Sequence, residues 1–489
     1  MNYRMLGYLL SLILLIEAGL MILPTIVSLI YGETPLPFLI TIGILLTVSL
    51  PGVIFRPHDT RIYATEGFVT VAAAWVLLSA FGALPFVLGG SVPNYIDAFF
   101  ETVSGFTTTG ASVLSEVESL PYGILFWRSF THFVGGMGVL VFMMAILPSA
   151  GNNTMHLLRA EVPGPTKGKL VPKMRNTALI LYTIYFLMMV VEVIALLCTG
   201  MPLFDSLVNA FATAGTGGFS VKNASITAYH NPAAEWIIAS FMILFGVNFN
   251  LYYFLFIRRF REVFGNGELR VYLTTVALST AAIAVNTYTV LRQAFSDVGE
   301  CVRTAFFQVA SVISTSGFST VDYNTWPEFS KAVLILLMLL GGCAGSTAGG
   351  LKVSRVMILF KSAGREIRHA LRPNSVNAIR MDGEAVPEET GRAAVNYFAL
   401  YIIIVTATTF LLSVDGYSLG TNLTATLACI NNIGPGLEAV GPASNFGGYS
   451  YFSKTLLSLS MLVGRLEIMP MLILFTPTSW LHRKRKRRV

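Results

Sequence analysis

Long apolar segments dominate the chain and are separated by short polar turns. A run of about 20 apolar residues can cross the hydrocarbon core of a bilayer as a helix. Ten full membrane spans are predicted, at 5–31, 35–54, 67–89, 121–147, 178–199, 233–257, 272–291, 329 onward, 393–412 and 452–475. The hydropathy pattern therefore predicts an all-α polytopic membrane protein.

Four shorter helical segments, roughly half the length of a span, interrupt this series. They are predicted at 95–106, 203–214, 300–313 and 421–430. A small stretch centred on one glycine follows each of them, and these glycines are Gly110, Gly218, Gly317 and Gly434. The glycines lie about 100 residues apart, which suits a whole membrane module rather than a solenoid repeat. The pattern predicts four pore repeats of the M1-P-M2 type (helix, pore loop, helix) with pseudo-fourfold packing.

An N-terminal transmembrane helix pair without the glycine motif precedes the repeats. The expected units are the helix pair at 1–62, pore repeats at 63–150, 172–265, 266–372 and 390–480, and a basic cytoplasmic tail at 481–489. Each repeat crosses the membrane twice and dips into it once, so all four glycine loops should enter from the same side, unlike the loops of inverted-repeat transporters.

The composition supports a membrane protein and argues against a nucleic-acid partner. The chain of 489 residues is 54% hydrophobic and 12% charged, with a mean hydropathy of +0.67. Its net charge of +7 is explained by basic residues that gather in alternate loops and in the terminal run HRKRKRR, as the positive-inside rule predicts. We therefore expect both termini in the cytoplasm and the glycine loops on the outside. The four cysteines form no CxxC pair and indicate neither zinc nor a disulfide framework.

The glycine loops are candidates for an ion filter. Non-helical backbone at membrane depth is tolerated only where protein or water surrounds it, because an unpaired peptide group in lipid costs several kcal/mol. Backbone carbonyls in a ring replace the water shell of a monovalent cation, and glycine permits the close approach. The alternative is that each glycine merely closes a tight turn. The candidate filter residues are Thr109, Gly110, Gly217, Gly218, Ser316, Gly317, Ile433 and Gly434.

The last span of the third repeat contains the run GGCAGSTAGG at 341–350. Each glycine costs nearly 1 kcal/mol of helix propensity relative to alanine, so the run predicts an intramembrane loop. Its spacing does not match a phosphate-binding GxxxxGK[ST] loop, and it lacks the preceding strand. Close helix packing through small residues is the alternative. The candidate loop residues are Gly341, Gly342, Gly345, Ser346, Thr347, Gly349 and Gly350.

Arg465 lies well inside the predicted span 452–475. An arginine at a helix centre costs about 2.5–3.5 kcal/mol on insertion scales, so its side chain should face water or an acid. In a pore it would place a fixed positive charge on the path of the ion. A buried ion pair with Glu192 or Glu467 is the alternative.

Together these motifs resemble the membrane subunit of the Trk/Ktr/HKT potassium transporter superfamily, and the extra N-terminal helix pair is similar to its TrkH-type branch. The matching segments are GFTTTGAS around Gly110, GTGGFS around Gly218, STSGFST around Gly317, GGCAGSTAGGLK at 341–352 and GRLEIMP at 464–470. The resemblance covers nearly the whole chain. It implies one filter glycine in each loop and a gate formed by the intramembrane loop and Arg465. The fourth loop, at 432–435, departs most from the other three.

The resemblance implies potassium uptake across the plasma (inner) membrane of a bacterial-type cell, with K⁺ as the transported ion and no organic cofactor in this chain. It also implies a homodimer and a cytosolic TrkA-like nucleotide-binding regulatory ring. A secondary transporter that couples K⁺ to H⁺ or Na⁺ is the alternative, which intramembrane acids such as Glu17 and Glu192 permit. A membrane enzyme is not expected, because the sequence shows no HExxH motif, Cys/His cluster or paired nucleophile and base.

Overall fold

The structure, a computed structural model, describes residues 2–55, 63–136, 174–292, 295–374 and 378–476, together with residues 57 and 138. This part of the chain is predominantly helical, as predicted, and a short antiparallel ribbon pairs β1 (Arg380–Met381) with β2 (Glu384–Ala385). The predicted basic tail at 481–489 and the end of the predicted span 121–147 lie outside the described residues.

The helices follow one another in the predicted order. The N-terminal unit contains α1 (Tyr3–Leu20), α2 (Ile22–Ile30) and α3 (Leu36–Ile54). Around Gly110 lie α4 (Ala64–Gly82), α5 (Leu84–Leu88), α6 (Tyr95–Phe106) and α7 (Tyr122–Gly136). Around Gly218 lie α10 (Met174–Cys198), α11 (Leu203–Gly215), α12 (Pro232–Phe245) and α13 (Phe249–Phe256). Around Gly317 lie α14 (Phe260–Gly265), α15 (Gly267–Val290), α16 (Val298–Ile313), α17 (Glu328–Leu340) and α18 (Val353–Leu371). Around Gly434 lie α19 (Glu388–Leu412), α20 (Leu419–Ile430), α21 (Tyr451–Arg465) and α22 (Met469–Phe475). Short 3-10 helices lie at Ser225–Tyr229, Tyr323–Thr325, Ser413–Asp415 and Glu438–Val440.

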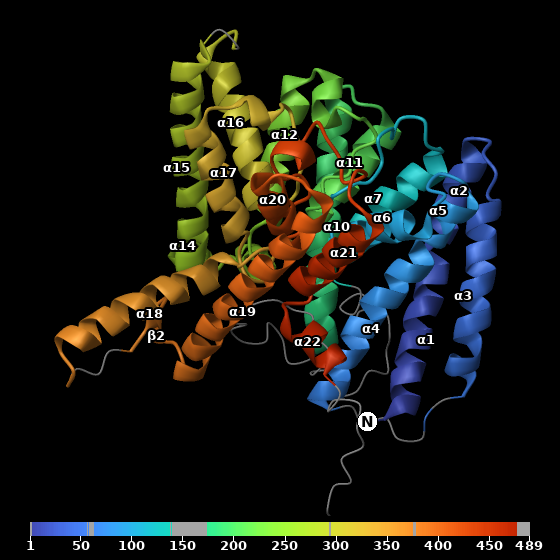
Figure 1. The fold of residues 1–489 in the computed structure, drawn as a ribbon, viewed down its shortest axis with the longest axis horizontal. Coiled ribbons are helices and arrows are strands. Elements are labelled where there is room, and N and C mark those ends of the chain that lie inside the picture. The colour runs from blue at the N-terminus through green and yellow to red at the C-terminus, as the bar shows by residue number, and fades with distance from the viewer. Residues whose placement is uncertain are drawn as a thin grey trace, which may run out of the picture.

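The half-length helices α6, α11, α16 and α20 are packed in a closed series. Each lies against the helix that follows the glycine loop of the preceding region, and the pairs are α7 with α11, α12 with α16, α17 with α20 and α21 with α6. In Figure 1, α11 and α16 lie in the upper half of the molecule, whereas α22 and the N-terminus of α1 lie at the bottom. The N-terminal helices lie on the opposite flank from α15 and α17. The chain thus surrounds one central axis.

Local sequence signals explain where the half-helices begin. Asn94, Asp297 and Ser418 are the N-caps of α6, α16 and α20, and the side chain of each accepts a hydrogen bond from a backbone N–H of the first turn. Such caps satisfy donors that the helix itself leaves unpaired. The C-terminal parts of these helices are buried. Their carbonyl ends therefore point into the protein interior, toward the glycine loops.

By length and composition, six helices of the described residues can cross a membrane, or seven if the bent pair α12 and α13 counts as one span. The count of ten spans stays a prediction. The structure has fewer long continuous helices than the ten predicted spans partly because the segments at 233–257, 329 onward and 452–475 are each divided into two helices. The last two divisions separate α17 from α18 and α21 from α22.

The division of 233–257 differs from the predicted continuous helix. Helix α12 ends at Phe245, and α13 starts at Phe249 with its axis turned by 94°. Asn248 is the N-cap of α13 and accepts a hydrogen bond from the amide of Asn250 (2.9 Å). Gly246 lowers the cost of leaving the helix, and its carbonyl oxygen accepts a bond from the amide of Cys343 (2.9 Å). A distant loop therefore takes up the backbone groups that the break exposes.

Candidate ion pathway

The four glycine loops meet in a closed ring. A Cβ built on each glycine would lie against the carbonyl oxygen of the residue that precedes the glycine in another loop. The pairs, glycine first and carbonyl second, are Gly110 with Gly217, Gly218 with Ser316, Gly317 with Ile433 and Gly434 with Thr109. The last of these distances is 2.7 Å, which is shorter than real Cβ contacts allow. The loops therefore follow chain order around the axis, and each central position requires a residue without a side chain.

All four loops have the same pattern of backbone angles. The central glycines have positive φ values, from 73° at Gly218 to 100° at Gly434. Two residues before each glycine stands a residue with φ between 55° and 58°, and these residues are Thr108, Thr216, Thr315 and Asn432. Left-handed conformations are rare for residues with a Cβ. Their recurrence at equivalent positions shows that the four turns have one geometry.

The residue before each glycine is fixed to its own half-helix. Its amide donates to the carbonyl oxygen five residues earlier, at 2.8 Å in every loop. The bonds run from Thr109 to Ser104, from Gly217 to Ala212, from Ser316 to Ser311 and from Ile433 to Ala428. The amide group is thus turned back to the helix, while the carbonyl oxygen of the same residue lies beside the neighbouring loop.

The fourth loop shares this geometry although its sequence departs most from the others. Asparagine tolerates the left-handed conformation better than most residues, and Asn432 occupies it here. Its side-chain amide donates to Thr109 Oγ1 (2.9 Å) and to the carbonyl oxygen of Met461 (3.0 Å). Asn432 therefore joins the fourth glycine loop to the first and closes the ring.

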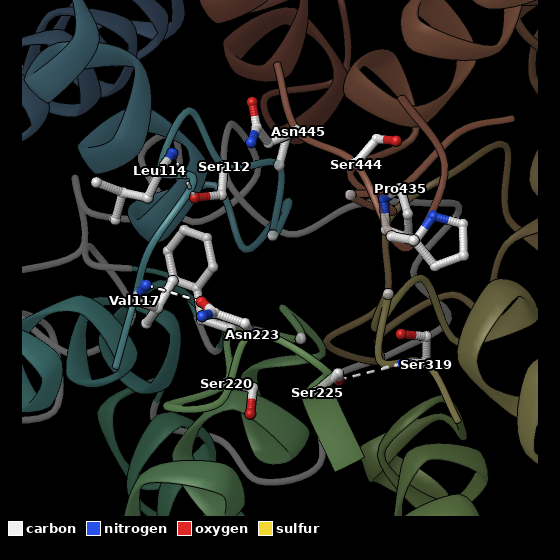
Figure 2. A pocket seen from close by; sticks show the side chains of 18 of the residues that line it. Ser112, Leu114, Val117, Ser220, Asn223, Ser225, Ser319, Pro435, Ser444 and Asn445 are labelled. Atoms are coloured by element: carbon white, nitrogen blue, oxygen red, sulfur yellow. Dashed lines mark hydrogen bonds between the residues drawn. The ribbon is translucent and has the colours of Figure 1, made fainter. Parts of the chain in front are cut away.

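A cavity of about 180 Å³ lies on one side of the ring, and all four central glycines line it. Ser112, Ser220 and Ser319 follow their glycines by two residues and line this cavity, as does Pro435 of the fourth loop (Figure 2). The lining also includes the polar side chains of Asn223 and Asn445. The cavity beside the ring is therefore lined largely by polar groups, with Arg128 and Lys222 as its charged residues.

The glycine-rich loop between α17 and α18 lies against the third and fourth loops of the ring. The amide of Gly349 donates to Thr315 Oγ1 (2.7 Å), and a Cβ on Gly349 would overlap the carbonyl oxygen of Asn431. Gly341, Gly345 and Gly350 have φ values of 72–74°. These positions let the chain turn repeatedly within a short segment.

The same loop fills the break between α12 and α13. The amide of Cys343 donates to Gly246, and the amide of Phe249 donates to the carbonyl oxygen of Gly345 (3.0 Å). Thr347 Oγ1 donates to the carbonyl oxygen of Phe245 (3.1 Å). Inside the loop, Ser346 Oγ donates to the carbonyl oxygen of Cys343 (2.6 Å), and Gly342 packs beside Ala348. The break between α12 and α13 and the loop between α17 and α18 thus supply hydrogen-bond partners for each other's backbone N–H and C=O groups.

Arg465, at the C-terminal end of α21, connects the ring to the glycine-rich loop. Its guanidinium donates to the carbonyl oxygens of Thr347 (2.8 Å), Gly136 (2.7 Å) and Gly135. It also reaches Thr108 Oγ1 (3.3 Å), in the first glycine loop. The side chain therefore lies where the ring, the loop and the end of α7 come together.

Glu192 and Glu467 are the alternative ion-pair partners that the sequence suggests for Arg465, and the structure gives Glu467 a different partner. Glu467 forms an ion pair with Arg355 of α18 (2.9 Å), and the Arg355 guanidinium also lies over the ring of Tyr397 (4.0 Å to the centroid). Glu192 is fully buried in α10. Arg465 already joins the end of α21 to the glycine-rich loop. The ion pair of Arg355 and Glu467 adds a second link, from α18 to the residues between α21 and α22.

Two charged residues behind the ring are not identified from the sequence. Glu101 in α6 and Arg128 in α7 form a buried ion pair (2.6 Å) beside the first two loops. His132, one turn after Arg128, stacks on Phe219 (4.2 Å between centroids), and a Cβ on Gly217 would overlap its ring. Opposite charges in neighbouring apolar helices are a signal for such a pair, but nothing in the sequence indicates which residues meet.

The long apolar helices indicate an integral membrane protein. The chain belongs to the TrkH family of cation transport proteins, because the family model described as "Cation transport protein" matches residues 38–482. The resemblance to the TrkH-type branch is thereby confirmed. Members of this family transport cations, so the protein is not an enzyme.

Relatives of known name match the chain over nearly its whole length. The Trk system potassium uptake protein TrkH of Salmonella typhimurium is 37% identical over 492 residues, which cover 98% of this chain and 100% of the relative. The protein of the same name from Escherichia coli strain K12 is also 37% identical, over 493 residues and the same shares of the two chains. The crystal structure of the potassium transporter TrkH from Vibrio parahaemolyticus superposes with a TM-score of 0.88 at 31% identity, covering 98% of this chain and 100% of that one.

Proposed function

We propose that this protein takes up K⁺ across the plasma membrane through a channel-like pore whose narrowest part is the ring of four glycine loops. The main support for this proposal is the ring, in which four loops of the same geometry bring four backbone carbonyls close to one another. The names of the relatives, which are Trk system potassium uptake proteins, support K⁺ as the ion.

In this proposal the carbonyl oxygens of Thr109, Gly217, Ser316 and Ile433 replace part of the water shell of K⁺. Carbonyl rings of this kind select monovalent cations by their size and dipole strength. The C-terminal ends of α6, α11, α16 and α20 point at the same region and carry partial negative charge, which favours a cation. The glycines Gly110, Gly218, Gly317 and Gly434 allow neighbouring loops to approach closely enough for the ring to form.

The glycine-rich loop and Arg465 form the proposed gate. The guanidinium of Arg465 holds the loop through Thr347 and touches the ring at Thr108. A positive charge at this place opposes the passage of a cation. Opening requires that the carbonyl contacts of Arg465 and the ion pair between Arg355 and Glu467 separate, so that both the loop and the charge leave the path.

The remaining features of the proposal concern assembly and orientation. We place the cavity of Figure 2 on the outside and both termini in the cytoplasm, in agreement with the basic residues at 258, 259, 261 and 270 and at 361, 365, 368 and 372. A homodimer and a cytosolic TrkA-like nucleotide-binding ring complete the proposed system. The phrase "Trk system" in the names of the relatives supports a complex of several components.

The test is ion uptake into liposomes that contain the full-length protein. Rubidium and sodium uptake are compared in potassium-loaded vesicles without a pH gradient, with empty vesicles as the control. Rubidium uptake that exceeds sodium uptake and needs no second gradient supports the pore. The same comparison with the regulatory ring and nucleotide distinguishes a closed gate from a different function. If neither condition gives selective uptake, the proposal is wrong.

Proton-coupled transport is the second candidate. Glu17 and Glu192 are fully buried, and the carboxylate oxygens of Glu17 have no hydrogen-bond partner within the described residues. Buried acids of this kind occur in proton relays. Uptake that appears only when a pH gradient is imposed, and that is lost in Glu17→Gln or Glu192→Gln, would favour this candidate over a passive pore.

A further inference from the structure

Two ion pairs hold the first half-helix, α6, to neighbouring helices. Asp97 pairs with Lys454 of α21 (2.7 Å), and Glu101, one turn later, pairs with Arg128 of α7 (2.6 Å). The side chains of Glu101 and Arg128 are 0% and 4% exposed. Charges buried to this degree are costly unless additional hydrogen bonds satisfy them. The contacts that the second pair makes therefore indicate what it holds in place.

The Glu101 carboxylate binds the first glycine loop. Its two oxygens accept hydrogen bonds from Ser112 Oγ (3.0 and 3.1 Å), and one of them accepts the amide of Val113 (3.0 Å). Ser112 and Val113 follow Gly110 by two and three residues. The carboxylate thus fixes the chain at the point where it leaves the ring, which limits where the carbonyl before Gly110 can lie.

The Arg128 guanidinium binds the second glycine loop. One of its terminal nitrogens donates to the carbonyl oxygen of Ser220 (3.0 Å). The guanidinium carbon also lies 3.5 Å from the centroid of the Phe219 ring, which is a close cation–π contact. Phe219 and Ser220 directly follow Gly218. Each member of the ion pair therefore holds one of two adjacent loops.

We infer that Glu101 and Arg128 act as a strut that sets the spacing between the first and second glycine loops and thereby determines the preference for K⁺ over Na⁺. This inference rests on the proposed function of the ring. The planar guanidinium reaches a carboxylate, a carbonyl oxygen and an aromatic face at the same time, which an ammonium group does not. The pair is a positioning element, because neither charge is placed at the carbonyl ring itself.

The strut also matters for the charge at the entrance. Arg128 lines the cavity, where its positive charge is compensated by Glu101. Removal of the Glu101 charge alone leaves an uncompensated cation beside the proposed ion path, which should reduce cation flux in addition to selectivity. Removal of both charges restores neutrality without restoring the links between the loops. The two effects can therefore be separated by single and double substitutions.

The experiment compares the wild type with Glu101→Gln, Arg128→Lys, the double variant Glu101→Gln/Arg128→Gln, and Asp97→Asn as the matched control. Asp97 lies on the same helix and forms a similar ion pair with Lys454 of α21. The test variants differ from it because Glu101 and Arg128 each bond directly to a glycine loop, at Val113 and Ser220. Two quantities are measured for each protein. The first is the ratio of rubidium to sodium uptake in liposomes, and the second is the shift of thermal unfolding in detergent on adding K⁺ or Na⁺, which needs no open gate.

We expect the rubidium-to-sodium ratio to fall at least about tenfold in Glu101→Gln and in Arg128→Lys, because selectivity depends on the arrangement of the carbonyl dipoles. The difference between stabilisation by K⁺ and by Na⁺ should shrink in parallel, and Asp97→Asn should keep both wild-type values. The double variant should regain flux but not selectivity. Arg128→Lys keeps the buried charge pair, so it remains informative if Glu101→Gln does not fold.

The outcomes separate this inference from the proposed function. If the wild type prefers K⁺ but the variants of Glu101 and Arg128 keep the wild-type ratio of rubidium to sodium uptake, the positioning role is wrong. The proposed pore is then unaffected. If the double variant regains selectivity together with flux, the effect is one of charge and the strut is again wrong. If the wild type itself shows no preference for K⁺ in either measurement, the proposed function fails before the strut is tested.

Discussion

Substitution of Gly218 by alanine tests the ring most directly. The added Cβ would overlap the carbonyl oxygen of Ser316 and lie 2.9 Å from the carbonyl carbon of Gly317. Ordinary carbon contacts begin at about 3.5 Å, so the third loop has to move by roughly 1 Å. A polar contact to a charged group contributes about 1.5–3 kcal/mol. Loss of one such carbonyl contact should therefore lower K⁺ binding by about 10- to 100-fold, since 1.4 kcal/mol corresponds to a factor of ten.

The matched control is Gly200→Ala. Gly200 also has a positive φ, of 89°, but a Cβ at this position meets no atom within 4 Å. Both variants therefore carry the strain of alanine in a left-handed conformation, about 1 kcal/mol, and only Gly218→Ala disturbs the ring. The assay is the ratio of rubidium to sodium uptake in liposomes, together with the potassium concentration that gives half-maximal uptake.

The expected result is a lower ratio and a higher half-maximal concentration for Gly218→Ala, with wild-type values for Gly200→Ala. A Gly218→Ala protein that folds and keeps the wild-type ratio would refute the assignment of this glycine to the filter. Equal losses in both variants would show that backbone strain, and not the contact with Ser316, is responsible.

Three further changes test other parts of the structure. Arg465→Ala removes the contacts to Thr347 and Thr108 together with the positive charge, so cation leak without the regulatory ring should rise; a variant as quiet as the wild type contradicts the gate. Asn432→Ala removes two hydrogen bonds and a residue suited to the left-handed conformation, and should lower stability by roughly 2–4 kcal/mol; an unchanged unfolding temperature in detergent would contradict the closure of the ring through Asn432. Outside the helical spans, hydrogen bonds from Ser418 and Thr421 lower the pKa of Glu438. Their stabilisation is present at neutral pH and is lost as the pH falls through the lowered pKa. Wild type should therefore unfold at a higher temperature than Glu438→Gln at pH 7 and at the same temperature well below that pKa; a difference that persists in acid would show that the charge is not responsible.

Local sequence patterns predicted much of the helical framework. The half-length apolar segments before Gly110, Gly218, Gly317 and Gly434 are recognisable because each is followed by a small stretch centred on the glycine. The glycine run at 341–350 predicted a break, because glycine is costly in a helix. Arg465 was identified because a base within an apolar span needs polar surroundings.

Tertiary structure decided which of these parts meet. The break between Phe245 and Phe249 was not predicted, because the loop that stabilises it lies about 100 residues away in the chain. Three of the groups that Arg465 contacts are backbone carbonyls. Backbone carbonyls are present at every position, so no residue pattern distinguishes these three. The pairing of Glu101 with Arg128 likewise depends on how two helices pack. The sequence by itself thus determined most of the apolar helices and their order, through local hydropathy and helix propensity. Only the packing of distant segments decided the closure of the ring and the contacts behind it.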